Sequence, residues 1–368
     1  MYYGGKAIES GGMGCIFKPA LKCIDDKSRP NNSISKLMHK HFANIEIYSL
    51  LNAMPIIKSI PNYNKYFIID DIKICQPSVL SFFDRLSIKN KCEQFNNINE
   101  NIDDYTIITM PYGGEDMYNV YNNKKLPNKL FNKINNKLIK LLLNAIIPIN
   151  NKKLYHFDIK PENILIKDNN LRIIDWGVSY IDYGVQVPEN IFLRPFQKNC
   201  MITNLLFDKI FIENYTIFLR NNPYNKNINN VKLFITKHYI KDKLNNDEIN
   251  ILTSVIIAFT DYTNLSFDYI KYYNDVYKHN IDIYGLVMCY KLFLNNVSKS
   301  IKKNLNNLFN NYKPIFNLEK IDLNAILYDL EKLNYINETK KVNFTVNNKT
   351  RKNKNLKILN RKPTPYYI

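Results

Sequence analysis

The pattern of apolar and polar positions changes near residue 112. Before that point, short apolar runs separated by turn-rich segments predict β-strands at 15–21, 33–38, 65–70 and 105–110. Residues 42–54 show apolar positions at helical spacing and predict a helix that ends before Pro55, because helical backbone is disfavoured before a proline. The polar stretch 71–104 is long for a strand connection and predicts a local insertion.

After residue 112 the pattern is mainly helical. Helices are predicted at 126–146, 247–259 and 282–294, where apolar residues recur at helical period. Between the first two, "HFDIKPENILI" (156–166) predicts a loop that enters a strand, and "LRIIDWG" (171–177) predicts a second short strand. The expected fold class is therefore α+β, with a small antiparallel β lobe carrying one main helix and a larger helical lobe.

Composition adds a charge preference and a domain organisation. The chain has 368 residues, 45% of them hydrophobic, and a formal net charge of +18. Such a charge favours anionic partners, although an A/T-rich coding sequence also explains the many lysines, and no known nucleic-acid motif is present. We expect a first lobe at 1–112, a second lobe at 113–340 with an insertion at about 200–280, and a flexible basic tail at 341–368.

The six cysteines and the apolar runs indicate the cellular compartment in which the protein resides. The cysteines are scattered without a Cys-x-x-Cys pair or a zinc spacing, which predicts free thiols in a reducing compartment. The N-terminal "MYYGGKAIES" has no apolar core of a signal peptide, and no apolar run is long enough to span a bilayer. We expect a cytoplasmic protein without a membrane partner.

A glycine-rich turn at residues 8–17 is the first candidate for chemistry. It holds Gly11, Gly12 and Gly14 between two apolar flanks. Glycine is needed where backbone N–H groups approach a phosphate, because a Cβ would stand in the way. A glycine-rich turn in a hairpin that binds nothing has the same pattern, so the turn alone leaves both interpretations open.

Lys36 and Glu46 are the second candidate. Lys36 lies in a predicted strand and Glu46 in the helix that follows, where it is the only Glu between Glu9 and Glu93. A carboxylate on the inner face of a helix needs a charged partner, which favours an ion pair with Lys36. Lys36 would then contact nucleotide phosphates. The alternative is two unrelated surface charges in a Lys-rich chain.

The two segments around Asp158 and Asp175 are the third candidate. Asp158 can accept a hydrogen bond from a substrate hydroxyl and orient it for in-line attack, while Lys160 can neutralise the transferred phosphate. Asn163 and Asp175 offer an amide oxygen and a carboxylate to Mg²⁺. Twelve residues separate these two, which suits a hairpin that brings them together. A polar turn explains either motif alone.

Taken in order, these motifs resemble those of eukaryotic-type protein kinases. "HFDIKPENIL" resembles the catalytic loop, "DWG" the metal-binding Asp-Phe-Gly, and "ITMPYGGEDM" the hinge with its Gly-Gly. The resemblance spans residues 8 to about 295 and implies a two-lobed protein-kinase-like fold in which Asp282 braces the catalytic loop. The residues it implies for nucleotide binding are Gly11, Gly12, Gly14, Ile16, Lys36, Glu46, Met110 and Tyr112.

The resemblance also implies an activity and partners. Lys160 is typical of Ser/Thr-specific catalytic loops, so transfer from ATP to protein Ser/Thr hydroxyls is implied, with Mg²⁺ or Mn²⁺. "GGMGCIFKPALKC" and "RPFQKNC" are similar to segments in the kinases of large nucleocytoplasmic DNA viruses. We expect a protein substrate, a monomer, and an acidic partner or nucleic acid on the tail.

Several positions depart from the family pattern. Glu9 stands where the first glycine of the turn belongs, and Trp176 replaces the Phe of Asp-Phe-Gly. Phe157 replaces the Arg that contacts a phosphate on the activation segment, which predicts activity without phosphorylation there. No clear Ala-Pro-Glu follows Gly177, so we expect a peptide-docking surface rebuilt from residues 189–199 and the insertion.

Three functions remain open at this point. The first is an active Ser/Thr protein kinase. The second is a pseudokinase that serves as a scaffold; the full set of polar residues argues against it, because decay usually removes at least one. The third is a small-molecule phosphotransferase on the same fold, which the glycine turn and the Gly-Gly hinge disfavour.

Overall fold

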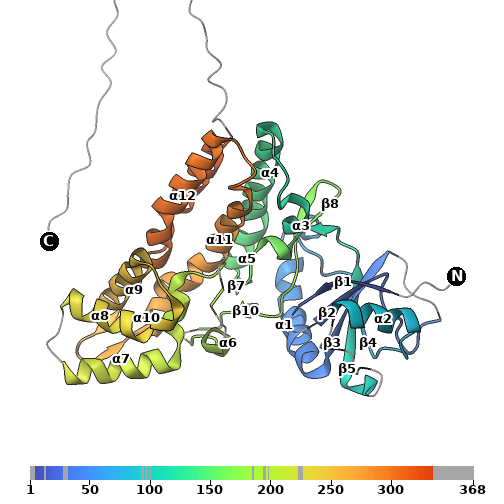
Figure 1. Cartoon of the computed structure of the whole chain (residues 1–368), viewed down its shortest axis with the longest axis horizontal. Coiled ribbons are helices and arrows are strands. Elements are labelled where there is room, and N and C mark those ends of the chain that lie inside the picture. Colours follow the sequence, from blue (N-terminus) through green and yellow to red (C-terminus); the bar gives the residue numbers. More distant parts are fainter. Residues whose placement is uncertain are drawn as a thin grey trace, which may run out of the picture. The chain divides into compact units, whose positions relative to one another are not determined.

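In the computed structural model, a β lobe and a helical lobe lie within residues 1–336 (Figure 1). The predicted tail at 341–368 and Gly12 lie outside the described residues. The structure describes residues 5–11, 14–27, 32–92, 95, 98, 101–184, 186–193, 196–197, 199–222 and 227–334.

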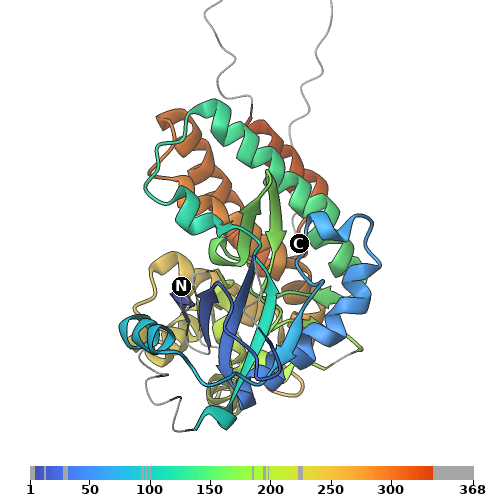
Figure 2. The same ribbon diagram turned by 90° about the vertical axis from the view of Figure 1, so that its right-hand side faces the viewer.

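A five-stranded antiparallel sheet forms the small lobe (Figure 2). Its strands, in the spatial order β1-β2-β3-β5-β4, are β1 (Lys6–Ser10), β2 (Gly14–Lys18), β3 (Ser33–His39), β5 (Tyr105–Pro111) and β4 (Lys73–Cys75). The strands predicted at 33–38 and 105–110 are confirmed, and the run at 15–21 forms β2 in its first half. β3 and β5 pair along their whole length, from Ser33 opposite Pro111 to His39 opposite Tyr105.

The prediction of a strand at 65–70 is wrong. Phe67 and Ile69 are buried at alternate positions, but the segment forms only one isolated bridge in the described structure, between Phe67 and Ile173. The strand that extends the sheet is β4, which pairs with β5. Alternating burial here comes from packing against the larger lobe, so apolar periodicity indicated the wrong element.

The main helix of this lobe, α1 (Lys40–Lys58), is longer than predicted. Pro55 lies inside it, and the helix continues to Lys58. A proline removes one backbone donor, but Pro55 occupies the exposed side of the last turn. Ala53 and Ile57 are both buried on the opposite side, so packing of that face stabilises the final turn.

The predicted insertion contributes β4 and helix α2 (Phe82–Lys91), and α2 covers the edge of the sheet. The N–H of Gly5 donates to Asp84 Oδ1 at 2.6 Å, and the N–H of Ala7 donates to Ser87 Oγ at 2.6 Å. An edge strand otherwise leaves such groups without partners in the sheet. The insertion therefore stabilises β1, the strand that leads into the glycine-rich turn.

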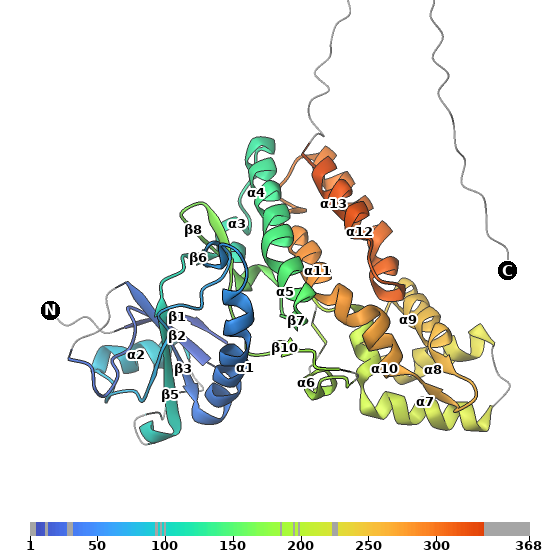
Figure 3. The same cartoon turned by 180° about the vertical axis from the view of Figure 1, so that it is seen from behind.

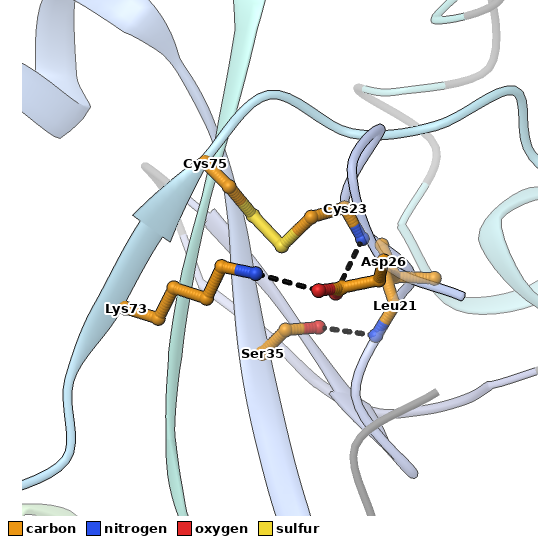
Figure 4. Close-up of a disulfide and its surroundings, with 6 residues drawn as sticks. All are labelled: Leu21, Cys23, Asp26, Ser35, Lys73 and Cys75. Atoms are coloured by element: carbon orange, nitrogen blue, oxygen red, sulfur yellow. Dashed lines mark hydrogen bonds and ion pairs between the residues drawn. A yellow bond between two sulfur atoms is a disulfide. The ribbon is translucent and has the colours of Figure 1, made fainter. Parts of the chain in front are cut away.

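Two disulfides fasten the insertion, and they correct the prediction of free thiols. Cys15 of β2 is bonded to Cys92 just after α2, and Cys23 is bonded to Cys75 of β4 (Figure 4). The Cα–Cα separations are 6.1 and 5.7 Å. The partners are 77 and 52 residues apart in sequence, so no local cysteine motif reveals them. Cys289 remains a buried thiol.

Polar contacts support the second disulfide (Figure 4). The carboxylate of Asp26 accepts hydrogen bonds from Lys73 Nζ at 2.5 Å and from the N–H of Cys23 at 3.1 Å. Ser35 Oγ accepts from the N–H of Leu21 at 2.8 Å. The loop after β2 is thus held to both β3 and β4.

The larger lobe is mainly helical (Figure 3). Its helices are α3 (Met117–Tyr121), α4 (Asn128–Leu141), α5 (Ile147–Asn151), α6 (Glu189–Leu193), α7 (Lys209–Asn221), α8 (Ile228–His238), α9 (Asn246–Ala258), α10 (Tyr269–Tyr272), α11 (Lys278–Cys289), α12 (Lys299–Leu318) and α13 (Leu323–Lys332). α11 lies at the centre of the lobe, because all its residues except His279 are buried. The three predicted helices are confirmed as α4, α9 and α11.

Short strand pairs complete this lobe. They are β6 (Glu115–Asp116), β8 (Ile164–Lys167) and β9 (Asn170–Ile173) in one sheet, β7 (Leu154–Tyr155) with β10 (Tyr180–Ile181), and β11 (Thr260–Asp261) with β12 (Ser266–Phe267). The predicted two-lobed α+β arrangement is confirmed, while the exact domain boundaries stay predictions. None of the helices described here is long and apolar enough to cross a bilayer.

Candidate active site

The structure places Lys36 between two carboxylates. Lys36 Nζ lies 2.6 Å from Glu46 Oε2 on α1 and 3.8 Å from Asp175 Oδ1, two residues after β9. Burial alone would lower the pKa of Lys36, but the carboxylates of Asp175 and Glu46 outweigh burial and raise that pKa. Lys36 is therefore a cation that links the β lobe to the segment carrying Asp175.

The glycine-rich turn lies directly beside this cation. The N–H of Gly11 donates to the carbonyl of Gly14 at 2.9 Å, which closes the turn between β1 and β2. Ile16 lies opposite Lys36 in the β2–β3 register. A Cβ added at Gly14 would come within 3.0 Å of Met38 Cγ, so glycine allows β2 to approach β3 closely here. A Cβ at Gly14 would also lie 3.2 Å from Lys36 Cε, so the start of β2 lies close to this lysine.

Glu9 directs negative charge at the same region. Its side chain remains exposed, yet desolvation of the carboxylate and the charges of Asp116, Glu162 and Asp175 raise its pKa. Lys36 opposes this shift. A phosphate beside Lys36 would therefore experience the charge of Glu9 as well.

The predicted hinge residues are tightly held. Met110 is half-buried near the end of β5. The N–H of Tyr112 donates to Asn32 O at 3.0 Å, and its carbonyl accepts from Lys167 Nζ at 2.9 Å. Lys18 Nζ lies 3.1 Å from the centre of the Tyr112 ring, a cation–π contact. The β lobe and β8 together fix the hinge.

Other atoms closely approach both glycines after the hinge. A Cβ at Gly113 would lie 2.2 Å from Ile68 Cδ1. Gly114 has φ +104°, and a Cβ there would lie 2.1 Å from the carbonyl oxygen of Ile166. Only glycine fits at the second position, because both its backbone angle and the contact exclude a side chain.

Asp158, Asn163 and Lys160 come together in the loop before β8. Asn163 Nδ2 donates to the carbonyl and to Oδ2 of Asp158, at 2.9 Å each. Lys160 Nζ lies 2.8 Å from Asp158 Oδ2. Asp158 is 8% exposed, so these contacts, more than water, balance its charge. The three predicted residues thus form one hydrogen-bonded group.

The predicted hairpin brings Asn163 and Asp175 to the same end. Ile164 of β8 lies opposite Ile173 of β9, and the N–H of Ile174 donates to the carbonyl of Asn163 at 3.1 Å. Asp175 has φ +68°, a left-handed conformation that is uncommon for a residue other than glycine. The backbone therefore makes a sharp turn at the carboxylate that faces Lys36.

Asp282 of α11 holds the backbone of the loop that contains Asp158. Its two carboxylate oxygens accept hydrogen bonds from the N–H groups of His156 at 2.8 Å and Phe157 at 2.7 Å. Phe157 has φ +64°. A Cβ on Gly285 would lie 2.6 Å from the carbonyl of Ile159, so α11 passes the loop at the distance only glycine allows. The buried helix thereby fixes the backbone on both sides of Asp158.

Sequence reasoning missed Asn199. Its Nδ2 donates to Asp158 Oδ1 at 2.9 Å, whereas Asn163 and Lys160 contact the other carboxylate oxygen. Asn199 belongs to "RPFQKNC", a segment that the sequence singled out but did not connect with the site. Forty-one residues separate it from Asp158, and no periodicity links them. In the sequence, Asn199 is only one more polar residue downstream of Asp175, so nothing there distinguishes it as a contact of Asp158.

The aromatic replacements are packed into the site. Trp176 is 3% exposed and lies 5.7 Å from the Phe67 ring and 4.7 Å from the His156 ring, between centroids. Phe157 stacks between Tyr155 and Tyr180, with centroid distances of 6.0 and 6.4 Å. Both rings pack the loop around Asp158 against the segment that follows Asp175.

Among the residues that the structure describes, no group of three or more His, Cys, Asp or Glu could hold a metal ion. Asn163 and Asp175, the ligands expected from the sequence, would be only two protein ligands. This suits Mg²⁺, which usually keeps several waters and is shared with substrate phosphates.

Comparison with known families agrees with this geometry. Residues 20–186 match the family model described as protein kinase domain. No curated protein matches the chain. The match includes Lys36, Asp158 and Asp175, but the glycine-rich turn and everything after residue 186 lie outside it. The fold and the match together make this chain protein-kinase-like.

Proposed function

We propose that this protein transfers the γ-phosphate of ATP to Ser or Thr hydroxyls of protein substrates. The observation that carries the proposal is the hydrogen-bonded group around Asp158, with Asn163 and Lys160 on one oxygen and Asn199 on the other. A carboxylate held in this way is oriented to accept a hydrogen bond from a substrate hydroxyl. Lys36 and Lys160 supply positive charge for the phosphates.

The nucleotide is proposed to lie beside the glycine-rich turn, with the hinge at Met110 and Tyr112 contacting the base. Glycine at positions 11 and 14 keeps Cβ atoms out of this turn, which lets a phosphate approach its backbone. Glu46 holds Lys36 in place through the 2.6 Å ion pair. These residues bind and orient; Asp158 and Lys160 are the ones that would contact the reacting groups.

Asn163 and Asp175 are the proposed Mg²⁺ ligands. The amide nitrogen of Asn163 donates to Asp158, which leaves its oxygen to face a cation. Bound Mg²⁺ would neutralise charge on the phosphates during transfer. The chain's own contribution is to keep the Asp175 carboxylate at the end of the β8–β9 hairpin beside Lys36.

Activity without phosphorylation of the activation segment is part of the proposal. Aromatic rings of Tyr155 and Tyr180 enclose Phe157, where the family's phosphate-binding Arg would stand. Two residues after Tyr180, Asp182 forms a buried ion pair with Lys278 of α11, with 2.6 Å between Nζ and Oδ2. The Asp182–Lys278 ion pair needs no phosphorylation, and it holds the start of this segment in place.

Label transfer from γ-labelled ATP with Mg²⁺ to a generic acceptor protein tests this function. We expect label on Ser and Thr after acid hydrolysis, and unchanged activity after phosphatase treatment of the enzyme. Label on Tyr would contradict the Ser/Thr assignment, and loss of activity on phosphatase treatment would contradict the assignment of phosphate-independent activity. ATP binding without transfer to any protein would favour the scaffold.

A further inference from the structure

A surface cavity in the larger lobe lies outside the catalytic group. Its volume is about 360 Å³. It is formed where α6, α7 and α10 lie next to one another (Figures 1 and 3). The residues that line it are Val187, Glu189, Phe192, Lys209, Ile212, Glu213 and Tyr269. Three of them belong to the segment after Asp175, and the others to the insertion at about 200–280.

The walls of this cavity are apolar and fixed. The Phe192 ring packs edge-on against Tyr269 at 5.7 Å and against Phe207 at 6.2 Å, between centroids. Val187 and Ile212 add aliphatic surface. A volume of this size accommodates one or two side chains of a partner and is at the lower end for small-molecule sites, about 300–1,000 Å³.

The rim of the cavity is acidic, although the chain as a whole carries +18. Glu189 and Glu213 contribute two carboxylates against the single cation of Lys209. Lys209 Nζ lies 3.8 Å from Glu189 Oε1, but their side chains are 62% and 79% exposed, so a guest can displace this weak pair. Glu213 forms no ion pair with any residue that the structure describes.

Lys209 also shows which chemistry fits the rim. Its Nζ lies 5.7 Å from the centre of the Phe192 ring. An aliphatic chain that ends in a cation is therefore accommodated between the aromatic wall and the glutamates. A Lys or Arg of a partner would make the same contacts, with Glu213 as an additional acceptor.

Helix α6 connects this cavity to the catalytic loop. Glu189 and Phe192 line the cavity, whereas Asn190 and Ile191 face a small space that Phe157 also lines. Asn190 Nδ2 donates to the carbonyl of Val178 at 3.1 Å. One short helix thus separates a guest in the cavity from the residue next to Asp158.

We propose that this cavity is a docking site for the acceptor protein, and that it binds a segment with an apolar side chain next to a Lys or Arg. The proposal rests on the proposed function, because it concerns how that enzyme would select its substrate. Charge complementarity favours a basic segment, and the aromatic wall favours an apolar neighbour.

A peptide library tests the docking site. Fluorescein-labelled peptides carry one Ser, with a Lys-Leu pair moved along the sequence in successive members. Fluorescence anisotropy measures binding without ATP, and label transfer from ATP measures turnover. The test variant is Glu189→Lys/Glu213→Lys, and the matched control is Glu319→Lys/Glu331→Lys, which reverses two exposed glutamates elsewhere on the larger lobe.

For the wild type and the control we expect the tightest binding and lowest peptide KM at one placement of the Lys-Leu pair. For the double variant we expect about tenfold weaker binding of that peptide, with the KM for ATP unchanged. Equal binding of all placements by the wild type, or unchanged binding by the double variant, would overturn the docking site. Transfer by the wild type with no placement preference overturns docking alone, whereas preferential binding without any transfer supports docking and contradicts the proposed function.

Discussion

At the scale of single residues, Asp158 is the group on which the other contacts converge. Asn163 and Lys160 contact its Oδ2, and Asn199 contacts its Oδ1. Below it, Asp282 holds the backbone of the two preceding residues. The carboxylate is therefore fixed in rotation as well as in position, which is what a group that orients a hydroxyl requires.

Asn199 is a positioning residue in this account. We expect Asn199→Ala to lower kcat about tenfold or more, because a hydrogen bond to a charged group contributes about 1.5–3 kcal/mol. Asn199→Asp should lower kcat further, since it places a second carboxylate against Asp158. Steady-state kinetics with ATP as the varied substrate make the measurement. A change in the KM for ATP of the same size as the change in kcat would contradict a positioning role.

We expect Glu9 to give the proposed nucleotide site a pH dependence. Desolvation of its carboxylate and the charges of Asp116, Glu162 and Asp175 raise the pKa of Glu9, so it binds its proton at a higher pH than an ordinary glutamate. Above that pKa its charge repels the phosphates, and below it the repulsion disappears. We therefore expect the KM for ATP of the wild type to fall towards that of Glu9→Gln as the pH is lowered through the pKa. Parallel pH profiles of the two proteins would disprove this role.

At the scale of elements, the insertion braces the β lobe. α2 completes the edge of β1 through Asp84 and Ser87, and the Cys15–Cys92 disulfide joins its end to β2. The glycine-rich turn connects these two strands. Both strands that carry the turn are thus anchored to α2, once by hydrogen bonds and once by a covalent bond.

Removing this disulfide should destabilise the protein. Closing a 77-residue loop contributes about 4.5 kcal/mol in the chain-entropy account. We expect Cys15→Ser/Cys92→Ser to unfold at a lower denaturant concentration than the wild type. A reductant should lower the unfolding midpoint of the wild type towards that of the variant. Equilibrium urea unfolding measures both. The Cys23–Cys75 bond remains in the variant, so further destabilisation on reduction reports that second bond. Identical midpoints for the wild type and the variant would refute the brace.

The elements also show where sequence reasoning succeeds and fails. The Lys36–Glu46 pair and the β8–β9 hairpin follow from neighbouring elements, so the order of motifs along the chain was sufficient to predict them. The disulfides join residues 52 and 77 positions apart, which only the folded sheet brings together. The segment at 65–70 has alternating burial without a strand, since its partners are side chains of the larger lobe. Asn199 was missed for the same reason: its contact depends on the path of the chain between residues 177 and 199.

At the scale of the whole molecule, charge is unevenly distributed along the chain. Residues 341–368 contain eight Lys and Arg and no Asp or Glu. We propose that this segment binds an acidic partner or nucleic acid, while the acidic rim near α6 and α7 selects a basic one. Separate parts of the chain would then serve recognition of opposite charge.

Truncation after Lys340 tests the proposed role of the basic segment. We expect weaker binding to a single-stranded oligonucleotide, with the slope of log K against log salt reduced by about 0.7 for each phosphate that the removed segment neutralises. Kinase activity on a short peptide should be unaffected. An unchanged salt slope would show that the positive charge of residues 1–340 is responsible for any binding to polyanions.

The most direct test of the central claim is phosphate transfer by Asp158→Asn beside the wild type, with ATP affinity measured on both. Asparagine keeps the shape of the side chain but removes the negative charge of the carboxylate that is proposed to accept the hydrogen bond from the substrate hydroxyl. We expect kcat to fall about 10²–10⁴-fold, the usual contribution of a general base, while ATP binds with nearly the same affinity. Transfer at the wild-type rate by the variant would contradict the assignment of Asp158 and, with it, the proposed mechanism.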